Sequence, residues 1–339
     1  MSKADSTELD VLVIGEVLLE ISSTEPLLDG SRPTLGFSKD ALNVACAAAS
    51  AGARTALLAR IPDDDLGDAV VAKLERYGVR TDTVIRGSGQ HGLYLSHGDP
   101  LGQRDFTYIR RGSFGSTLQP QDLDPDLVGR TAVVTASGIA TAISDSCAAL
   151  VEHAAGLARR FVYDPNFRSR LTTVDRAAGA FARLLPQCAV VTPSWPGELT
   201  TLLGLPAGTT ESAAIDRLRA LGAKDIVLTR GARGSLVVVG DQTVEVPVIP
   251  APTVVDQTGA GDSMTGTLCA RLSAGDDLVE AVRSGTAAAS LTVGALGGTG
   301  FVPSLQQIRA HRSAHQSSGT TNQVQPTNQV QLTNQGAQS

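Results

Sequence analysis

Apolar segments of strand length alternate with helical segments along most of the chain, and this alternation limits the possible folds. The strand-like runs are nearly continuous in apolar residues, which indicates strands buried on both faces. They cover residues 10–16, 55–61, 131–139, 161–168, 189–194 and 225–239, and the helical patterns cover 40–52, 63–77, 145–160, 263–272 and 277–293. Strands that alternate with helices favour a parallel sheet covered by helices on both faces. The sequence therefore predicts an α/β fold.

Composition excludes several classes of protein. A chain of 339 residues with 42% hydrophobic residues is long enough for one large α/β domain or two smaller ones. The net charge of −6 provides no basic surface for nucleic acid. No apolar run is long enough to span a membrane, and Met1 to Glu8 contain no apolar core of a signal peptide. We expect a cytoplasmic protein that binds neither nucleic acid nor a membrane.

Four cysteines are scattered along the sequence, at Cys46, Cys147, Cys188 and Cys269. They form no C-x-x-C pair, and no histidines cluster near them, so the pattern indicates neither a zinc site nor a disulfide framework. We expect these cysteines to be reduced and to lie in the core.

A glycine-rich turn lies between Val255, where we predict that a strand ends, and Ser263, where we predict that a helix starts. Unpaired amides at a helix N-terminus attract anions, and Gly259 and Gly261 let the backbone approach a phosphate closely. Asp262 would repel that phosphate unless it takes a proton from the hydroxyl that attacks it. The alternative is that Asp262 only favours the dipole of the helix that follows.

The string Asp256-Gln257-Thr258-Gly259-Ala260-Gly261-Asp262 resembles the C-terminal signature D-T-x-G-A-G-D of the ribokinase/PfkB family of carbohydrate and nucleoside kinases. Gln257 occupies a position where Thr is common. The resemblance implies that Asp262 is the catalytic base and that the amides of Gly259, Ala260 and Gly261 hold the transferring phosphoryl group. It also implies ATP and Mg²⁺ as cofactors, whereas dependence on a monovalent cation stays open.

The resemblance spans residues 9–312, which would form one kinase domain with a ribokinase-like three-layer sandwich, a central mostly parallel sheet and a small β-sheet lid. The lid would comprise residues 16–38 and 88–113, and by analogy with the family it could support a homodimer. Beyond Arg312 the chain contains no charged residue, and Thr-Asn-Gln-Val-Gln recurs. We therefore expect residues 313–339 to form a disordered low-complexity tail.

The N-terminal signature of the family has two glycines followed at fixed steps by Asn and Ala, and Asn43 and Ala45 match it. In the family, the two glycines let the sugar approach the backbone. Ser38 and Lys39 stand in their place here. The resemblance thus implies that Asn43 and Lys39 border the sugar. Lys39 would fill part of the pocket or add a positive charge to it, and a merely solvated Lys39 is equally consistent with the sequence.

Tyr94, Tyr108 and Arg110, together with Arg168 in the segment Asp-Pro-Asn-Phe-Arg, resemble the 2-keto-3-deoxygluconate kinase branch of the family. The resemblance implies that the tyrosines and Arg110 contact a sugar acid and that Arg168 binds its acidic end. Tyrosines supply flat apolar area with a polar tip, and a guanidinium can grip a carboxylate bidentately. The alternatives are tyrosines that cover an exposed sheet face and a surface arginine.

The resemblance also suggests residues for the nucleotide and the metal. The nucleotide candidates are Asn166, Ser194, Thr229, Gly231, Gly234 and Thr286, and the metal candidate is Glu198. Two positions depart from the family: Trp195 replaces the Asn of an N-x-x-E motif, and Thr286 replaces an Asn near adenine. The segment 87–92 formally matches G-x-G-x-x-G, but a strand follows it instead of a helix, so we predict a hairpin loop there.

These observations predict ATP-dependent phosphorylation of a hydroxyl of a sugar acid such as 2-keto-3-deoxygluconate. Two alternatives remain open. One is a kinase of the same fold that acts on another sugar, a nucleoside or a secondary-metabolite sugar, which Lys39 favours. The other is a non-catalytic sugar-binding regulator, which the departures at Lys39, Trp195 and Thr286 suggest.

Overall fold

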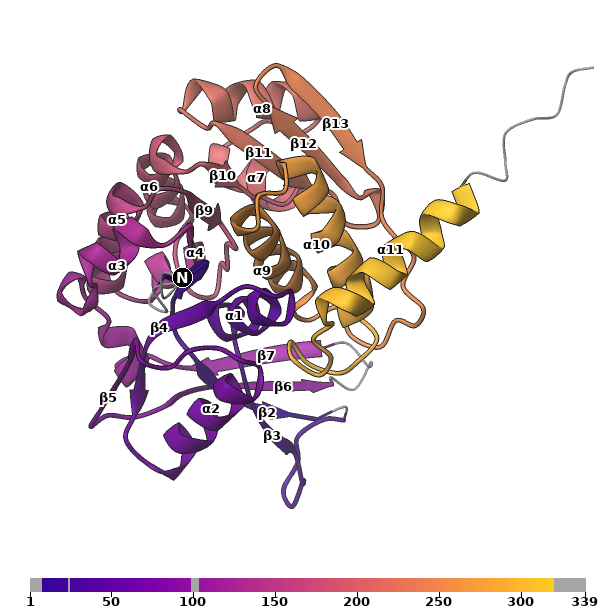
Figure 1. Cartoon of the computed structure of the whole chain (residues 1–339). Helices are drawn as coiled ribbons and strands as arrows, with labels where there is room; N and C mark the ends of the chain where they lie inside the picture. Colours follow the sequence, from indigo (N-terminus) through magenta and orange to yellow (C-terminus); the bar gives the residue numbers. More distant parts are fainter. Residues whose placement is uncertain (1–7, 24, 99–103, 320–339) are drawn as a thin grey trace, which may run out of the picture.

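The computed structural model describes residues 8–23, 25–98 and 104–319, and it contains two sheets (Figure 1). The large sheet has nine strands in the order β13-β12-β11-β10-β9-β8-β1-β4-β5, and the small sheet has four in the order β3-β2-β6-β7. The strands are β1 (Val11–Ile14), β2 (Leu18–Ser22), β3 (Thr34–Ser38), β4 (Thr55–Pro62), β5 (Val84–Gly87), β6 (Gly92–Gly98), β7 (Arg104–Ile109), β8 (Val133–Ser137), β9 (Phe161–Asp164), β10 (Val190–Val191), β11 (Asp225–Thr229), β12 (Ser235–Val239) and β13 (Gln242–Val246). The predicted α/β fold is confirmed.

Strand direction in the large sheet follows the alternation in the sequence. Strands β5, β4, β1, β8, β9, β10 and β11 are parallel to one another, because a helical crossover separates most consecutive pairs. At one edge, β11 and β12 pair in the antiparallel sense, with Leu228 opposite Leu236. The hairpin predicted within residues 225–239 is therefore confirmed.

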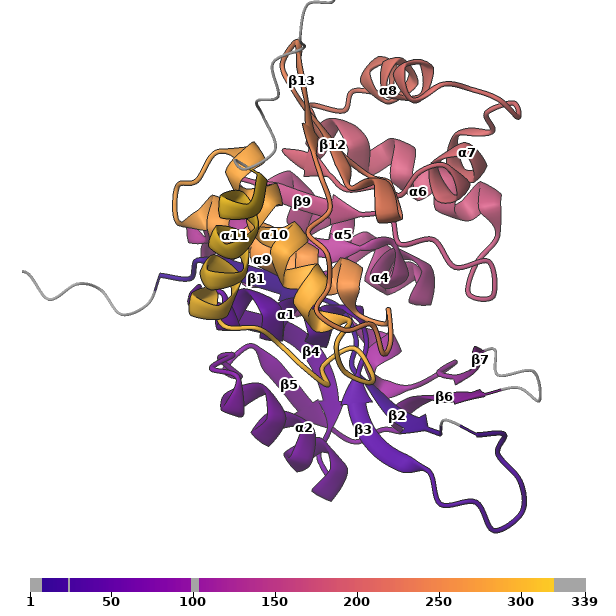
Figure 2. The same cartoon turned by 90° about the vertical axis from the view of Figure 1, so that its right-hand side faces the viewer.

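Helices cover both faces of the large sheet, as Figures 1 and 2 show. They are α1 (Asp40–Ser50), α2 (Asp65–Arg76), α3 (Pro125–Arg130), α4 (Gly138–Ile143), α5 (Asp145–Leu157), α6 (Val174–Leu184), α7 (Gly197–Leu203), α8 (Glu211–Ala220), α9 (Ala260–Ser273), α10 (Leu278–Thr292) and α11 (Leu305–Gly319). Short 3-10 helices span Phe114–Thr117, Pro120–Asp122, Leu185–Gln187 and Gly231–Arg233.

Two hydrophobic cores lie on opposite faces of the large sheet. Leu12 and Ile14 of β1 pack in a core with α3 to α8, whereas Val11 and Val13 pack in a core with α1, α2, α9, α10 and α11. Successive side chains of a strand point to opposite faces, so a strand that is buried on both faces must be apolar at every position. This is why the strand segments of the sequence are continuous in apolar residues.

Helices α1 and α9 pack unusually closely because small residues meet at their interface. A Cβ atom at Gly266 of α9 would lie 2.4 Å from the carbonyl oxygen of Val44 and 2.8 Å from the Cβ of Ala47. Leu42 and Leu268 are fully buried beside this contact.

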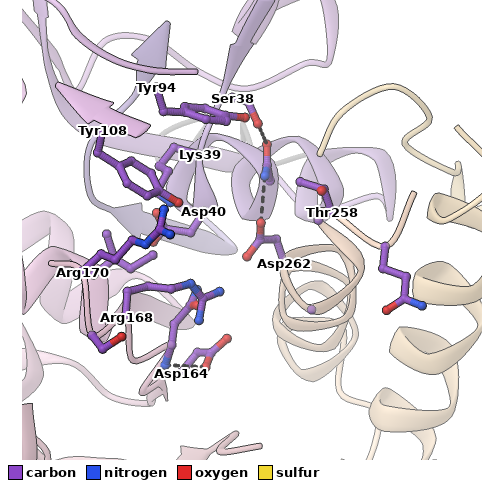
Figure 3. Close-up of a pocket in the computed structure, with 17 residues that line it drawn as sticks. Ser38, Lys39, Asp40, Tyr94, Tyr108, Asp164, Arg168, Arg170, Thr258 and Asp262 are labelled. Atoms are coloured by element: carbon purple, nitrogen blue, oxygen red, sulfur yellow. Dashed lines mark hydrogen bonds between the residues drawn. The ribbon is translucent and has the colours of Figure 1, made fainter. Parts of the chain in front are cut away.

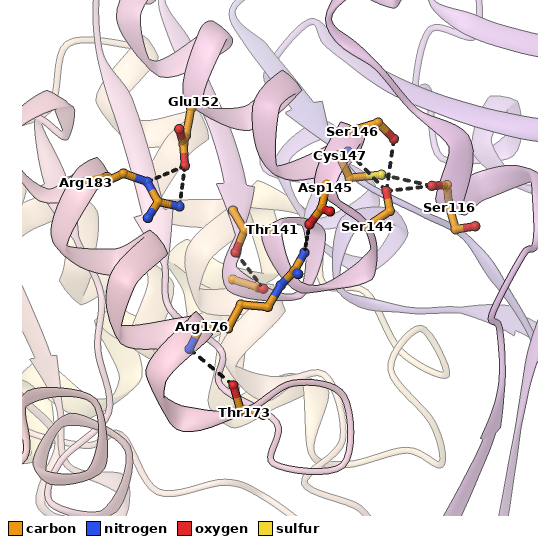
Figure 4. Close-up of polar contacts among 11 residues, drawn as sticks. Ser116, Thr141, Ser144, Asp145, Ser146, Cys147, Glu152, Thr173, Arg176 and Arg183 are labelled. Atoms are coloured by element: carbon orange, nitrogen blue, oxygen red, sulfur yellow. Dashed lines mark hydrogen bonds and ion pairs between the residues drawn. The ribbon is translucent and has the colours of Figure 1, made fainter.

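Polar contacts at the surface connect α5 to its neighbours (Figure 4). Arg183 of α6 donates from Nε to Oε1 of Glu152 at 2.9 Å, and Arg176 of α6 pairs with Asp145. Ser144 accepts the Cys147 amide at the start of α5 and donates to the carbonyl of Ser116. Exposed ion pairs contribute only about 0–1 kcal/mol each, so the buried core stabilises this layer more than these contacts do.

Three local predictions differ from the structure. Val254 and Val255 form no strand; they are exposed in a loop, where the Val255 amide donates to Val293 at the end of α10. Helix α9 begins at Ala260 instead of Ser263, because Gly259 adopts the left-handed conformation that starts it. Segment 87–92 is not a hairpin loop, because β5 pairs with β4 of the large sheet and β6 pairs with β2 of the small sheet.

The C-terminal boundary of the kinase domain stays a prediction. Helix α11 runs through Gly319, so the boundary expected at residue 312 falls inside it. The rest of the expected tail, residues 320–339, lies outside the described residues.

All four cysteines are buried and free, as predicted. Among the residues that the structure describes, no helix is long and apolar enough to cross a membrane.

We expect Gly266→Ala to lower the free energy of unfolding by about 1–3 kcal/mol, because the added methyl group would overpack the contact between α1 and α9. Urea denaturation followed by circular dichroism would measure this. Gly129→Ala in α3 is the matched control, since a Cβ atom there would meet no other atom within 4 Å and Ala is the better helix former. Equal stability of the two variants would contradict the close packing.

Candidate active site

A cavity of about 480 Å³ opens at the carboxyl ends of the parallel strands, beside the small sheet and the start of α9 (Figure 3). Ligands of open α/β sheets bind in this position. Its lining residues are Ser38, Lys39, Asp40, Asn43, Tyr94, Tyr108, Ile139, Asp164, Asn166, Arg168, Ser169, Arg170, Gln257, Thr258, Gly259, Gly261 and Asp262. The structure thus brings together most of the acceptor and catalytic candidates, which come from widely separated segments of the chain.

The turn before α9 is held from within the chain. The Asp256 carboxylate accepts the Thr258 amide at 3.0 Å through Oδ1 and the Gly297 amide at 2.7 Å through Oδ2. Gly259 has φ of 81°, and a Cβ there would lie 2.6 Å from the backbone of Gly298, so only glycine fits. The turn therefore begins the helix beside the cavity with a fixed backbone.

Ala260 differs from the two glycines beside it. Its amide donates to the Gln257 carbonyl at 3.3 Å, and the residue does not line the cavity. Gly259 and Gly261 do line the cavity. The three consecutive amides predicted to bind a phosphoryl group are thus not equivalent in this structure.

Asp262 lies at the end of a short chain of hydrogen bonds. Asn43 donates from Nδ2 to Oδ2 of Asp262 at 2.7 Å, and Ser38 donates to Oδ1 of Asn43 at 3.2 Å. Burial raises the pKa of Asp262, and the nearby Asp40 carboxylate raises it further, whereas the Asn43 hydrogen bond and the charges of Lys39 and Arg168 lower it. Asp262 is therefore a half-buried carboxyl whose proton affinity exceeds that of an ordinary aspartate.

Asp40 is a site residue to which the sequence analysis assigned no contact with a ligand. Its Oδ2 accepts a hydrogen bond from Ser137, while its buried Oδ1 has no hydrogen-bond partner among the described residues. A buried acceptor without a donor is uncommon in folded proteins, so it suits a hydroxyl of a bound molecule. The residue matches the N-terminal signature of the family, but that match alone did not indicate a carboxylate oxygen without a partner.

Aromatic and cationic side chains line the side of the cavity nearest the small sheet. The rings of Tyr94 and Tyr108 stack with centroids 5.9 Å apart, and Nζ of Lys39 lies 5.0 Å from the Tyr108 centroid. Arg168 and Arg170 come from the loop after β9 (Figure 3). Arg170 was missed by the sequence analysis, although its position two residues after Arg168 could have indicated it.

Asp164 ends β9 and lies close to two other carboxylates. Burial raises its pKa well above the ordinary value, and the charges of Glu198 and Asp262 raise it further. Asn166 follows with φ of 40°, a left-handed conformation that Asn tolerates, and its amide donates to Asp164 at 3.0 Å. Asp164 was not among the predicted site residues, although its place at the carboxyl end of a parallel strand was a usable signal.

Glu198 lies outside the cavity lining and connects two loops. Its Oε1 accepts the Phe167 amide at 2.6 Å, and its Oε2 accepts the Ser194 amide at 2.8 Å and the Ser194 hydroxyl. Among the described residues, no group of three or more His, Cys, Asp or Glu side chains is arranged to hold a metal ion. Glu198 thus holds the loops after β9 and β10 together.

Arg110, which we predicted to contact a sugar acid, is also not among the residues that line the cavity. Its guanidinium forms an ion pair with Glu16, and both side chains are buried. Burial raises the pKa of Glu16 to about 7, with the charge of Arg110 acting in the opposite direction. In this structure the partner of Arg110 is therefore a residue of the chain itself.

The nucleotide candidates divide into two groups outside the cavity, apart from Asn166. Ser194 and Thr229 are bridged to each other at the ends of β10 and β11, and Gly231 and Gly234 lie in the turn that follows. Thr286 is buried in α10, and its hydroxyl has no partner among the residues described.

Comparison with known proteins agrees with this geometry. A model described as pfkB family carbohydrate kinase matches residues 9–305. The chain belongs to the pfkB carbohydrate kinase family. It is 30% identical over 304 residues to the 2-dehydro-3-deoxygluconokinase of Thermoproteus tenax, a match that covers 87% of this chain and 92% of the relative.

Two further comparisons extend the match. The 2-dehydro-3-deoxygalactonokinase of Haloferax volcanii is 28% identical over 292 residues, covering 83% of this kinase and 90% of the relative. A structure from E. coli, described as a ribokinase II in complex with ATP and Mg²⁺, superposes with a TM-score of 0.80 at 21% identity. That superposition covers 91% of this kinase and 100% of the E. coli chain. The ribokinase-like fold is thereby confirmed.

We expect Asn43→Ala to raise the pKa of Asp262 further, because the variant removes the hydrogen bond that favours the ionised carboxylate. Carbon-13 NMR titration of aspartate carboxyl groups would measure the shift, with Asp262→Asn used to assign the signal. Ser38→Ala is the matched control, since it removes the donor to Asn43 and leaves the bond from Asn43 to Asp262. A lowered or unchanged pKa in Asn43→Ala would contradict the expected electrostatics.

Proposed function

We propose that this kinase transfers the γ-phosphoryl group of ATP to a hydroxyl of a sugar acid such as 2-keto-3-deoxygluconate, which is also written 2-dehydro-3-deoxygluconate. The observation that carries the proposal is the content of one cavity. It holds the half-buried carboxylate of Asp262 at the start of a helix, together with stacked tyrosines and the cations Lys39 and Arg168. The names of the relatives from Thermoproteus and Haloferax support an acidic acceptor.

Asp262 would act as the general base. Its Oδ2 accepts from Asn43, so Oδ1 is the oxygen that takes the proton from the acceptor hydroxyl. The pKa of Asp262 is raised towards neutral pH. A general base is most effective when its pKa lies near the working pH. This proton transfer would contribute about 10²- to 10⁴-fold to the rate.

The start of α9 would receive the transferring phosphoryl group. The first amides of a helix lack intrahelical acceptors, and the helix dipole adds positive potential there. Gly259 and Gly261 line the cavity directly. The bond from Ala260 to Gln257 is long at 3.3 Å, so the Ala260 amide can turn to the phosphoryl oxygens at little energetic cost.

The carboxylates near β9 fit a magnesium ion. Mg²⁺ prefers oxygen ligands and is usually held by one or two carboxylates together with phosphates and water. Asp164 lies close enough to Glu198 and Asp262 for their charges to raise its pKa, and a divalent cation would relieve that repulsion. We assign Asp164 as the direct ligand, with Glu198 acting through water. The bound ion would neutralise charge on the phosphates.

The nucleotide would lie beyond this point, across the ends of β10 and β11. Ser194, Thr229, Gly231 and Gly234 gather there, and Asn166 connects this region to the cavity. The hydroxyl of Thr286 in α10 has no partner among the described residues. It would form a hydrogen bond with the base of the nucleotide.

Arg168 would bind the carboxylate of the acceptor, while Tyr94 and Tyr108 pack against its carbon chain. A guanidinium matches a carboxylate in shape and charge. Because Arg110 is neutralised by Glu16, its part in this proposal is to support Tyr108, whose ring centroid lies 5.8 Å from its guanidinium carbon. The small sheet would serve as the lid over the acceptor.

The small sheet would also carry a homodimer contact. Its edge strands β3 and β7 expose Leu35 and Ile109, which are 52% and 57% accessible to solvent. Exposed edge strands with apolar side chains favour pairing with a second chain. We place the kinase in the cytoplasm, where its donor ATP is abundant. A different acceptor remains the second candidate, because position 39 departs from the glycine of the family's sugar site.

We expect Asp262→Asn to lower kcat on the best acceptor by at least about a hundredfold, because the variant cannot take the proton. ADP release with Mg·ATP would be measured against sugar acids, neutral sugars and nucleosides. Ser273→Ala, at the far end of α9, is the control for the helix. Turnover of sugars without loss in Asp262→Asn would contradict the assigned base, and turnover only of nucleosides would contradict the acceptor.

We expect Arg168→Met to raise KM for a sugar acid by about tenfold or more, since the lost guanidinium no longer pairs with the carboxylate, an interaction of about 1.5–3 kcal/mol. KM for a neutral sugar should change little. Arg159→Met, at an exposed position, controls for the loss of one positive charge. An equal rise in KM for acidic and neutral acceptors would show that Arg168 does not bind the carboxylate of the acid.

A further inference from the structure

Lys39 has a backbone conformation that lysine rarely adopts. Its φ is 117° and its ψ is 157°, at the position just before α1. This region is almost exclusive to glycine, and other residues hold it only where the surrounding structure imposes it. Such strain concentrates at functional sites, so the presence of a lysine here requires an explanation.

The fold does not explain the lysine. A residue at a helix N-cap stabilises the helix when its side chain accepts a hydrogen bond, and a lysine ammonium can only donate. Accordingly, the side chain of Lys39 makes no capping bond to α1. Glycine would satisfy the backbone and start the helix equally well. The reason for a lysine must therefore lie in its ammonium group.

That ammonium group lies in the cavity. Nζ is 5.0 Å from the ring centroid of Tyr108 and 5.9 Å from that of Tyr94, so it shares the two aromatic side chains that would pack against the acceptor (Figure 3). Its charge lowers the pKa of Asp262 and that of Glu16. Within the described part of the chain, no ion pair joins it to a carboxylate, although Asp40 is its neighbour in sequence.

We propose that Lys39 is an acceptor-specificity residue that binds an anionic oxygen of the acceptor beside the stacked tyrosines. The inference rests on the proposed function and deepens it: Arg168 and Lys39 approach the acidic acceptor from different elements, the loop after β9 and the start of α1. Backbone strain at residue 39 is the structural cost of placing this second cation. Neutral acceptors gain nothing from it, so Lys39 shifts the preference of the site towards acids.

Three substitutions separate the charge from the backbone. Lys39→Met keeps the length of the side chain and removes the charge, Lys39→Arg keeps the charge, and Lys39→Gly removes the strain and the charge together. Lys224→Met, at an exposed position, is the control for net charge. Each variant of the full chain would be assayed for ADP release with a sugar acid and with a neutral sugar, and its thermal unfolding midpoint would be measured.

We expect Lys39→Met to raise KM for the sugar acid at least tenfold with kcat changed less than threefold, and KM for the neutral sugar to stay the same or fall. Lys39→Arg should retain most of the preference for the acid. Lys39→Gly should match Lys39→Met in KM and should unfold at a higher temperature than the wild type, which is the opposite of most substitutions in a binding site. Lys224→Met should match the wild type in every measurement.

The possible failures are distinguishable. If the wild type phosphorylates the acid and Lys39→Met does so with an unchanged KM, the inference is overturned while the proposed function stands. If Lys39→Gly unfolds at a lower temperature than the wild type, the claim that lysine is held against the preference of the backbone is overturned. If the wild type phosphorylates no acid, the proposed acceptor is overturned, and the inference falls with it.

Discussion

The hydrogen bond from Asn43 to Asp262 is the interaction on which the geometry of the site depends. It joins the first turns of α1 and α9, and its two residues are separated by 219 positions in the sequence. Asn43 is itself held by Ser38 at the end of β3, and the turn before Asp262 is held by Asp256. One continuous set of polar contacts thus runs from the small sheet to the start of α9, where a phosphoryl group would lie.

The site collects negative charge in a buried region. Asp40, Asp164 and Asp262 all line one cavity, and their mutual repulsion contributes to the raised pKa values of Asp164 and Asp262. Burying like charges costs stability unless cations or bound ligands compensate. The protein compensates only partly, through Arg168 and Lys39, so a site built in this way is completed by the cations that accompany its substrates.

The fold could be predicted largely from the sequence, because its signals are local. Continuous apolar strands and intervening helices follow from residue order alone, and so did the hairpin of β11 and β12. The linkage of β5 to β6 was mispredicted because the partner of a strand depends on the tertiary structure: β6 pairs with β2, a strand from much earlier in the chain. Val254 and Val255 were misread because two apolar residues are too few to reveal a period.

The site could be predicted in part. The catalytic and acceptor candidates carried family motifs, and most of them line one cavity. The pairing of Arg110 with Glu16 could not be foreseen, because a sequence shows which side chains carry charge and not which charges neutralise each other. The same limit applies to Asp40: its match to the family's N-terminal signature could not show that its Oδ1 lacks a partner among the described residues.

The lack of a side chain at Gly266 affects the site as well as the packing of the two helices. At Gly266, one turn further along α9 than Asp262, α9 contacts α1 directly. The closeness of this contact limits how far apart Asn43 and Asp262 lie. Glycine has the smallest side chain, so any substitution at residue 266 can only increase the separation of the two helices. Substitutions at this interface can therefore change the surroundings of the Asp262 carboxylate only by moving α1 and α9 apart, which would lengthen the hydrogen bond from Asn43.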